Sequence, residues 1–298
     1  MGLSVIIPFF RGESHINELI SSITDSATLH QPGYPIQVII LIDSMESGIT
    51  QIQEIIHAYQ HPDITFQVEK NSENKGVAAT RNEGIRLSNQ EHLLFIDQDD
   101  LLDINFFKYI TAGFLQTFDF LLYNGKFKFD SGVEHTIYYI PPPLSLRSLI
   151  LDDFIRSPGQ VIVKKERIEK TGFPVPLKYH GADDKFCWVW LFYKNPSMKV
   201  KYLHRSLYIA SIHAGNYSHD QLNLVKSTMD LWQVTLEKYP ELSSNKLVQR
   251  NIRLLNYRLG KLTGMEKLQG SFEFINYKMK ANKVIRKLIK KFLFTIQK

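Results

Sequence analysis

Short apolar stretches alternate with stretches of helical periodicity along the first hundred residues. The apolar stretches are rich in β-branched residues, which is typical of buried strands, and the intervening stretches have a helical repeat of apolar positions. Strands that alternate with helices predict a parallel sheet with helices on both faces. The predicted strands are residues 3–7, 36–42, 64–68 and 92–96, and the predicted helices are residues 16–23, 50–59 and 77–87. Pro8 is expected to end the first strand and Ser14 to cap the first helix.

After residue 101 the pattern is less regular. Further strands are predicted at residues 120–123, 160–163 and 199–203, and helices at residues 106–118 and 182–193. Three consecutive prolines, Pro141 to Pro143, predict a loop. The chain is predicted to be helical beyond His219. We therefore expect one domain at residues 1–218, with halves at 1–100 and 101–218, followed by a helical region at 219–298.

Polar residues follow the predicted strands at the edge where parallel sheets bind ligands. The clearest group is Asp97-Gln98-Asp99-Asp100, directly after an apolar strand. Carboxylates this close raise one another's pKa unless a cation neutralises them. Hard oxygen ligands of this kind suit Mg²⁺ or Mn²⁺ held together with substrate phosphates. The alternative interpretation is a solvated turn or helix cap.

A second group surrounds the start of the helix predicted at 77–87. Gly76 permits a tight turn into a helix whose N-terminus favours phosphate. Arg81 would project from this helix as a permanent cation suited to phosphate or a nucleobase. Its substitution by alanine is then expected to weaken nucleotide binding and to leave the fold intact. The alternative is an ordinary capped helix with a surface arginine.

Charge is distributed unevenly along the chain. The formal net charge is +6, but residues 220–298 hold 16 Lys+Arg and 6 Asp+Glu, so the body is mildly acidic. The overall basicity is therefore no argument for nucleic-acid binding, and no nucleic-acid partner is expected. The single cysteine, Cys187, excludes an internal disulfide. Without a signal-peptide pattern or a long apolar stretch, the sequence predicts a soluble, cytoplasmic protein.

The C-terminal segment, residues 278–298, holds eight basic residues and no acidic one. Its apolar residues fall on one side of a helix and its lysines and arginines on the other. A basic amphipathic helix is typical of peripheral binding to a membrane surface, here the inner face. The alternative is a terminal helix that packs its apolar side on the protein body.

Four motifs in order resemble those of the family 2 glycosyltransferases. They are Ser4–Phe10, Val38–Ser44, Asn74–Gly84 and Phe95–Asp100. The resemblance implies a GT-A nucleotide-diphospho-sugar transferase fold, with a Rossmann-like, mostly parallel sheet, helices on both faces and a C-terminal helical extension. It makes residues 1–100 the nucleotide-binding half and 101–218 the acceptor-binding half. The donor-binding residues that it implies are Pro8, Phe10, Asp43, Asn74, Gly76, Arg81 and Asp97, and the metal ligand is Asp99.

Further along the chain, Gly181–Trp188 resembles the acceptor motif of the same family. The resemblance makes Asp184 the catalytic base and places Asp183 where the family usually has glutamate. Gly172-Phe173 resembles the turn that precedes this motif. Residues 212–218 resemble a segment that closes over the diphosphate, so His213 is a candidate for binding metal or phosphate, or else a structural histidine.

The predicted reaction transfers a sugar from a nucleotide-diphosphate donor, with a UDP-sugar expected, to a hydroxyl of a glycan or lipid-linked saccharide acceptor. Mn²⁺ or Mg²⁺ would stabilise the departing diphosphate, and a carboxylate would accept the proton of the attacking hydroxyl. Inversion by single displacement rests on the resemblance. The implied enzyme is a hexosyl- or N-acetylhexosaminyl-transferase of polysaccharide or lipopolysaccharide biosynthesis. The alternatives are a sugar nucleotidyltransferase and a non-catalytic nucleotide-sugar binder or scaffold.

Two segments depart from the family pattern. Ser44-Met45-Glu46 follows Asp43 where the family usually has a second acid, a glycine and a serine. Arg11 stands where an asparagine is common. Both departures lie beside the expected nucleotide site, so they affect the expected contacts to the base and ribose and the choice of donor.

Overall fold

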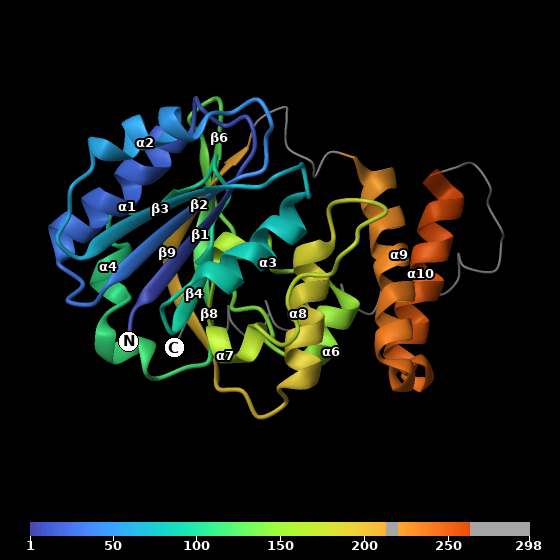
Figure 1. The fold of residues 1–298 in the computed structure, drawn as a ribbon. Coiled ribbons are helices and arrows are strands. Elements are labelled where there is room, and N and C mark those ends of the chain that lie inside the picture. Colours follow the sequence, from blue (N-terminus) through green and yellow to red (C-terminus); the bar gives the residue numbers. More distant parts are fainter. Residues whose placement is uncertain (213–219, 263–298) are drawn as a thin grey trace, which may run out of the picture. The chain divides into compact units, whose positions relative to one another are not determined.

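The computed structural model describes residues 1–212 and 220–262, and the chain divides into two compact units between residues 219 and 220. Nine strands of the first unit form one mixed sheet with helices on its faces (Figure 1). The strand order is β3-β2-β1-β4-β8-β6-β9-β5, and β7 pairs with β6. The α/β fold expected from the sequence is confirmed.

Four strands form the parallel half of the sheet: β1 (Leu3–Phe9), β2 (Ile36–Ile42), β3 (Ile64–Lys70) and β4 (His92–Phe95). The expectation that Pro8 ends β1 is wrong, because the strand continues to Phe9. The carbonyl of Ile6 faces β4, where it accepts from Ile96, so residue 8 faces the same side. The last β1 residue paired with β4 is Ile6, so the missing N–H of Pro8 breaks no ladder hydrogen bond.

The other half of the sheet is mixed. Its strands are β5 (Leu101–Leu102), β6 (Phe120–Phe129), β7 (Glu134–Thr136), β8 (Val161–Lys164) and β9 (Val200–Ile212). Strand β8 is antiparallel to both β4 and β6, whereas β6 and β9 are parallel. Strands β6 and β9 are much longer than the sequence predicted, because they stay paired beyond the predicted residues. In β6 the extension leaves the buried part, whereas in β9 it contains the buried residues Leu207, Tyr208 and Ala210. This extension carries β9 to the carboxyl end of β4.

The helices of the first unit are α1 (Ile16–His30), α2 (Ile49–His57), α3 (Val77–Leu87), α4 (Phe106–Tyr109), α5 (Ala112–Leu115), α6 (Leu146–Leu151), α7 (Lys165–Ile168) and α8 (Asp183–Lys194). A 3₁₀ turn, η1 (Pro158–Gln160), precedes β8. Ser14 does not cap α1, because His15 holds that position and the first amides bond to the carbonyl of Gly12. The single helix expected at 106–118 is two short helices. The Tyr34 hydroxyl donates a hydrogen bond to the Ile110 carbonyl at 2.7 Å, and Thr111 caps the second helix.

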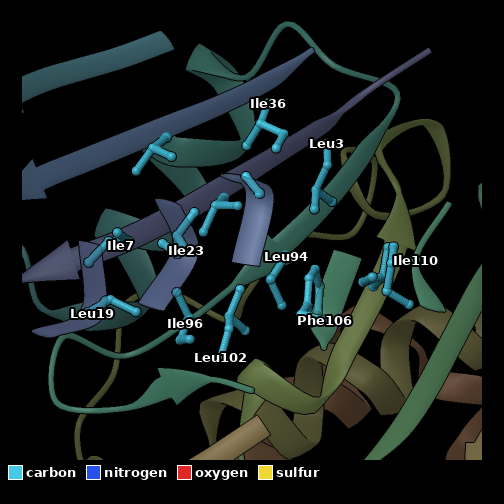
Figure 2. Packing of buried hydrophobic residues seen from close by; sticks show 14 of the residues in the cluster. Leu3, Ile7, Leu19, Ile23, Ile36, Leu94, Ile96, Leu102, Phe106 and Ile110 are labelled. Carbon is cyan, nitrogen blue, oxygen red and sulfur yellow. The ribbon is translucent and has the colours of Figure 1, made fainter. Parts of the chain in front are cut away.

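The main core lies between the sheet and the helices α1 and α4. Figure 2 shows Leu3 and Ile7 of β1 together with Leu19 and Ile23 of α1 and Phe106 of α4, all fully buried. Helix α3 covers the opposite face, where Gly84 permits its close approach: a Cβ there would lie 2.3 Å from Cγ2 of Ile6. Two packed faces fix the carboxyl edge of the parallel strands, and this edge carries the polar motifs.

The second unit contains α9 (Gln221–Lys238), the 3₁₀ turn η3 (Pro240–Ser244) and α10 (Lys246–Leu262). Asp220 caps α9 by accepting from the Asn223 amide at 2.9 Å, and the Trp232 indole donates to Asn251 of α10. The helical region expected beyond residue 219 is thus present as far as residue 262. The segment 278–298 lies outside the described residues, so its membrane contact stays a prediction. Within residues 1–212 and 220–262, no helix has the length and apolar character needed to cross a bilayer.

His92 at the start of β4 is fully buried. Neither ring nitrogen has a hydrogen-bond partner among the described residues, and the ring makes an edge contact with Phe118. Burial lowers the pKa of His92 below its ordinary 6.5 and outweighs the nearby Glu91 carboxylate, which raises it. The folded protein therefore binds fewer protons here than the unfolded chain, and this costs stability as pH falls below 6.5.

We expect the free energy of unfolding to fall between about pH 7.5 and about pH 5.5, and His92→Leu to flatten this dependence because it removes the buried titrating group. Urea unfolding at the two pH values measures the difference. The matched control is His204→Asn, which removes an exposed imidazole from β9 and should keep the slope of the unsubstituted protein. An equal slope in the His92 and His204 variants would contradict the assignment.

Candidate active site

The loop after β1 is locked to the motif after β4. The Gln98 side chain accepts from the Phe10 amide at 2.7 Å and donates to the Phe10 carbonyl at 2.9 Å. The Phe10 ring remains 44% exposed at the carboxyl edge of the sheet. The sequence motif includes Gln98 but gave no sign of this clamp, which was missed. The clamp fixes the backbone that presents Pro8 and Phe10, two of the predicted donor-binding residues.

Asp43 follows β2 and holds the segment that leads into α3. Its buried carboxylate accepts from Nδ2 of Asn71 at 2.7 Å, from the Lys75 amide at 2.9 Å and from the Gly76 amide at 2.8 Å. Gly76 has a φ of 81°, which strongly favours glycine, and its amide also bonds to Oδ1 of Asn74 at 3.1 Å. Asp43 therefore builds the turn at the start of α3, and its contact with the donor base stays a prediction.

Arg81 is the junction of the site. Its Nη2 lies 2.6 Å from Oδ1 of Asp97, and its Nη1 lies 3.0 Å from Oδ2 of Asp183. The side chains of Arg81 and Asp183 are each only 6% exposed. Both terminal nitrogens bind carboxylates, so Arg81 is not the free cation expected from the sequence, and its contact with the nucleotide stays a prediction. Arg81 instead connects the end of β4 to the start of α8.

Electrostatics keep this junction ionised. Burial lowers the pKa of Arg81, but Asp97, Asp183 and Asp184 together raise it above its ordinary value. The guanidinium carbon also lies 5.3 Å from the centroid of the Phe173 ring. The planar fork of arginine can hold two carboxylates on different elements at once, which lysine cannot do in the same geometry.

The acidic group after β4 has three different environments. Asp97 is bound to Arg81, and Asp100 is buried and accepts hydrogen bonds from the Tyr208 hydroxyl and from the Ser211 amide at 2.9 Å. Burial, Asp97 and Asp99 raise the pKa of Asp100 well above its usual range. Asp99 is only partly buried. Asp97 and Asp100 thus have partners within the protein, Asp99 remains the candidate metal ligand, and the contact of Asp97 with the donor stays a prediction. The partner Tyr208 on β9 carried no signal in the sequence.

No group of three or more His, Cys, Asp and Glu side chains in residues 1–212 and 220–262 is arranged to hold a metal ion. His213, the second predicted ligand, lies outside the described residues. Magnesium and manganese sites of nucleotide enzymes commonly use one or two carboxylates together with substrate phosphates. A site with Asp99 as the protein carboxylate fits that pattern, because it does not require a preformed cage.

Asp183 and Asp184 begin α8. Asp183 is buried against Arg81, whereas Asp184 is partly buried and its Oδ1 accepts from the Lys185 amide at 2.7 Å. Burial, Asp153 and Asp183 raise the pKa of Asp184 well above its ordinary 3.8, although Arg81 lowers it. Asp153, just after α6, was missed by the sequence because nothing in its surroundings marks it. The two neighbouring acids therefore have different environments, one held in an ion pair and one with a raised pKa.

The Gly172-Phe173 turn is bound to α3. Nδ2 of Asn82 donates to the Phe173 carbonyl at 2.9 Å, and Oδ1 of Asn82 accepts from the Phe173 amide at 2.7 Å. Gly172 has a φ of 62°, and a Cβ there would lie 2.7 Å from Oδ1 of Asn82. Two sequence motifs 90 residues apart thus form one structural unit, with Arg81 and Asn82 contacting α8 and this turn respectively.

The fold and these junctions define a class of protein. The sequence of residues 4–170 matches the family described as Glycosyl transferase family 2, and this match covers more than half of the chain. The chain belongs to that family. The resemblance to family 2 glycosyltransferases and the expectation of a glycosyltransferase are thereby confirmed at the level of the family.

Among curated relatives, the chain is similar to the poly(ribitol-phosphate) beta-N-acetylglucosaminyltransferase TarP of Staphylococcus aureus. The two are 32% identical over 100 residues, which are 34% of this chain and 29% of the relative. The matched region thus spans less than a third of that relative.

Solved structures share the fold. S. aureus TarS in complex with UDP-GlcNAc superposes with a TM-score of 0.65 at 20% identity, over 93% of this chain and 79% of that one. The mannosyltransferase PcManGT of Pyrobaculum calidifontis, in complex with GDP-Man and Mn²⁺, gives a TM-score of 0.55 at 14% identity, over 94% and 80%. These likenesses confirm the GT-A glycosyltransferase fold expected from the sequence.

Proposed function

We propose that the protein transfers a sugar from a UDP-sugar to a hydroxyl of a glycan or lipid-linked saccharide. The observation that carries the proposal is the Asp97–Arg81–Asp183 junction, which ties the carboxyl end of β4 to the N-terminus of α8. Asp184, next to this junction, has a raised pKa. A nucleotide-binding edge is thereby fixed against a carboxylate that can accept a proton, which is the arrangement that sugar transfer to a hydroxyl requires.

In the proposed reaction, Asp184 accepts the proton of the acceptor hydroxyl while the hydroxyl oxygen bonds to the anomeric carbon of the donor. The bond from that carbon to the diphosphate breaks in the same displacement, so the configuration inverts. Asp183 does not take part as a base, because its carboxylate forms the buried ion pair with Arg81. A carboxylate with a raised pKa is a stronger proton acceptor than an ordinary one, provided that it is ionised at the working pH.

The proposed cofactor is Mn²⁺ or Mg²⁺. Asp99 is its proposed ligand among the residues that the structure describes, and His213 is a further candidate. When bound, the ion supplies positive charge for the departing diphosphate. Phe10, Asn74 and Gly76 lie on loops fixed by Gln98 and Asp43, so the donor meets a preformed edge. The structure of TarS with UDP-GlcNAc and the likeness to TarP favour UDP-GlcNAc as the first donor to test. A role in cell-surface polysaccharide synthesis and a cytoplasmic location, peripheral on the inner face of the membrane, are part of the proposal.

The test is calorimetric titration with UDP, followed by a panel of nucleotide sugars scored for donor hydrolysis. We expect UDP to bind with millimolar or better affinity in the presence of Mn²⁺ and at least about tenfold more weakly in EDTA, because a divalent cation offsets the repulsion between carboxylates and diphosphate. Asp99→Asn should remove the metal-dependent part of binding, whereas Asp130→Asn, which neutralises a carboxylate at the β6–β7 turn, should not. Equal binding with and without metal would contradict the metal site. Binding without turnover of any donor would indicate a nucleotide-sugar binder.

A further inference from the structure

The two departures from the family pattern contact each other. Arg11 follows β1 and Glu46 follows β2, and Nη2 of Arg11 lies 2.8 Å from Oε1 of Glu46. A second contact joins the same two loops, because the Ser47 hydroxyl donates to Oε1 of Glu13 at 2.5 Å. The segments 10–13 and 44–48 are therefore joined by side chains at the carboxyl edge of adjacent parallel strands, where a nucleoside is expected to bind.

The loop that carries Glu46 is held in place by its backbone. The Lys70 ammonium donates to the carbonyls of Met45 at 3.0 Å and Ser47 at 2.8 Å. The Ser44 hydroxyl oxygen accepts from the amides of Glu46 and Ser47, both at 3.3 Å. With the backbone anchored, the Glu46 carboxylate is a fixed partner for Arg11 rather than the end of a freely moving loop.

The loop that carries Arg11 has a strained backbone. Arg11 has a φ of 52°, a conformation rare for a residue with a side chain. Its guanidinium carbon lies 5.2 Å from the centroid of the Phe10 ring, which is 44% exposed. Strain of this kind persists only where the surroundings impose it, and it is concentrated at ligand-binding sites. Here the Gln98 clamp on Phe10 and the Glu46 carboxylate are the surroundings.

Stability does not explain the ion pair. The side chains of Arg11 and Glu46 are 58% and 70% exposed, and ion pairs at such exposure contribute little to the free energy of unfolding. The pair instead joins the side chains of two loops whose backbones are anchored, beside the exposed Phe10 ring. A weak, exposed pair beside a strained residue and an exposed aromatic ring is better explained by a ligand between or against the loops.

We propose that Arg11 and Glu46 form a brace that sets the spacing of the two loops around the donor's nucleoside and so determines which base the site accepts. The inference rests on the proposed function and adds the residues that set its donor specificity. With the brace closed, the Phe10 ring can stack on a pyrimidine, as aromatic side chains do on bases. Separated loops would admit a larger purine and hold uracil less closely.

The test uses equilibrium binding of UDP, GDP and inorganic diphosphate, all with Mn²⁺, to the full chain. Arg11→Glu and Glu46→Arg each place like charges across the two loops and should raise the Kd of UDP about fivefold, the scale of one exposed ion pair. The Kd of inorganic diphosphate should not change, and the preference for UDP over GDP should narrow. The double charge reversal, R11E with E46R, should restore both UDP affinity and base preference.

The matched controls are Arg86→Glu and Glu83→Arg, which reverse an ion pair of the same chemistry on α3, whose side chains are 67% and 31% exposed. They should leave all three Kd values unchanged. If the single reversals at Arg11 and Glu46 leave UDP binding unchanged, or if the double reversal is no better than either single variant, the brace is wrong while the transfer function stands. If the unsubstituted protein binds no nucleoside diphosphate, the proposed function itself fails.

Discussion

Asp184→Asn is expected to lower kcat by about 10²-fold or more and to leave the Kd of UDP unchanged. Asparagine keeps the size of the side chain but cannot accept the proton of the acceptor hydroxyl. The change leaves the Arg81 junction in place, because that junction uses Asp183. Steady-state transfer kinetics, normalised to the folded fraction, measure kcat, and calorimetry measures UDP binding. A kcat near that of the unsubstituted protein would remove Asp184 from the mechanism.

The pH dependence of the transfer rate tests the role of Asp184 as the base independently. A base must be ionised, and burial together with Asp153 and Asp183 raises the pKa of Asp184 well above its ordinary 3.8. Transfer should therefore decline with falling pH at values higher than those typical of an exposed aspartate. Asp152→Asn is the control, because it removes an acid next to Asp153, after α6, that is not proposed to touch the acceptor. It should retain kcat to within about one order of magnitude.

Arg81→Ala is expected to lower the free energy of unfolding by about 3 to 5 kcal/mol, the usual cost of removing one partner from a buried ion pair. Asp183 would remain buried without its counter-ion, and Asp97 would lose the group that connects it to α8. The corresponding decrease in Tm is on the order of 10 °C for a domain of this size. Differential scanning calorimetry or urea unfolding measures the loss.

The control is Arg86→Ala on the same helix, since Arg86 is 67% exposed and its loss should leave Tm unchanged. Arg81→Lys keeps the charge, but a lysine cannot hold both carboxylates in the geometry of the guanidinium. The Tm of this variant should therefore lie between those of Arg81→Ala and Arg86→Ala. The interpretation drawn from the sequence was the opposite, namely that Arg81→Ala spares the fold and weakens nucleotide binding. An unchanged Tm for Arg81→Ala would favour that earlier interpretation and contradict the junction.

Local patterns were sufficient for the parallel half of the fold. The strands β1, β2 and β4 are almost entirely buried, so their apolar sequences predict them directly, whereas the edge strand β3 is only partly buried. Helix α3 matched its expected bounds, 77–87, because Gly76 opens it and the serine after Leu87 is extended. A single helix at 106–118 does not form, because the hydroxyl of Tyr34, more than 70 residues earlier in the chain, donates a hydrogen bond to the Ile110 carbonyl. No local pattern can report a hydrogen bond from so distant a residue.

The sequence by itself determined the family, the order of the motifs and the positions of the candidate acids, because these depend on residue type and spacing. Only the tertiary structure decided what each charged group contacts. In the folded protein Arg81 binds Asp97 and Asp183. Asp100 accepts a hydrogen bond from Tyr208, and Arg11 forms an ion pair with Glu46. Electrostatic energy depends on distance and burial, and the chain brings together residues up to about a hundred positions apart. The identity of an acid is therefore readable from the sequence, whereas its partner and its pKa are properties of the fold.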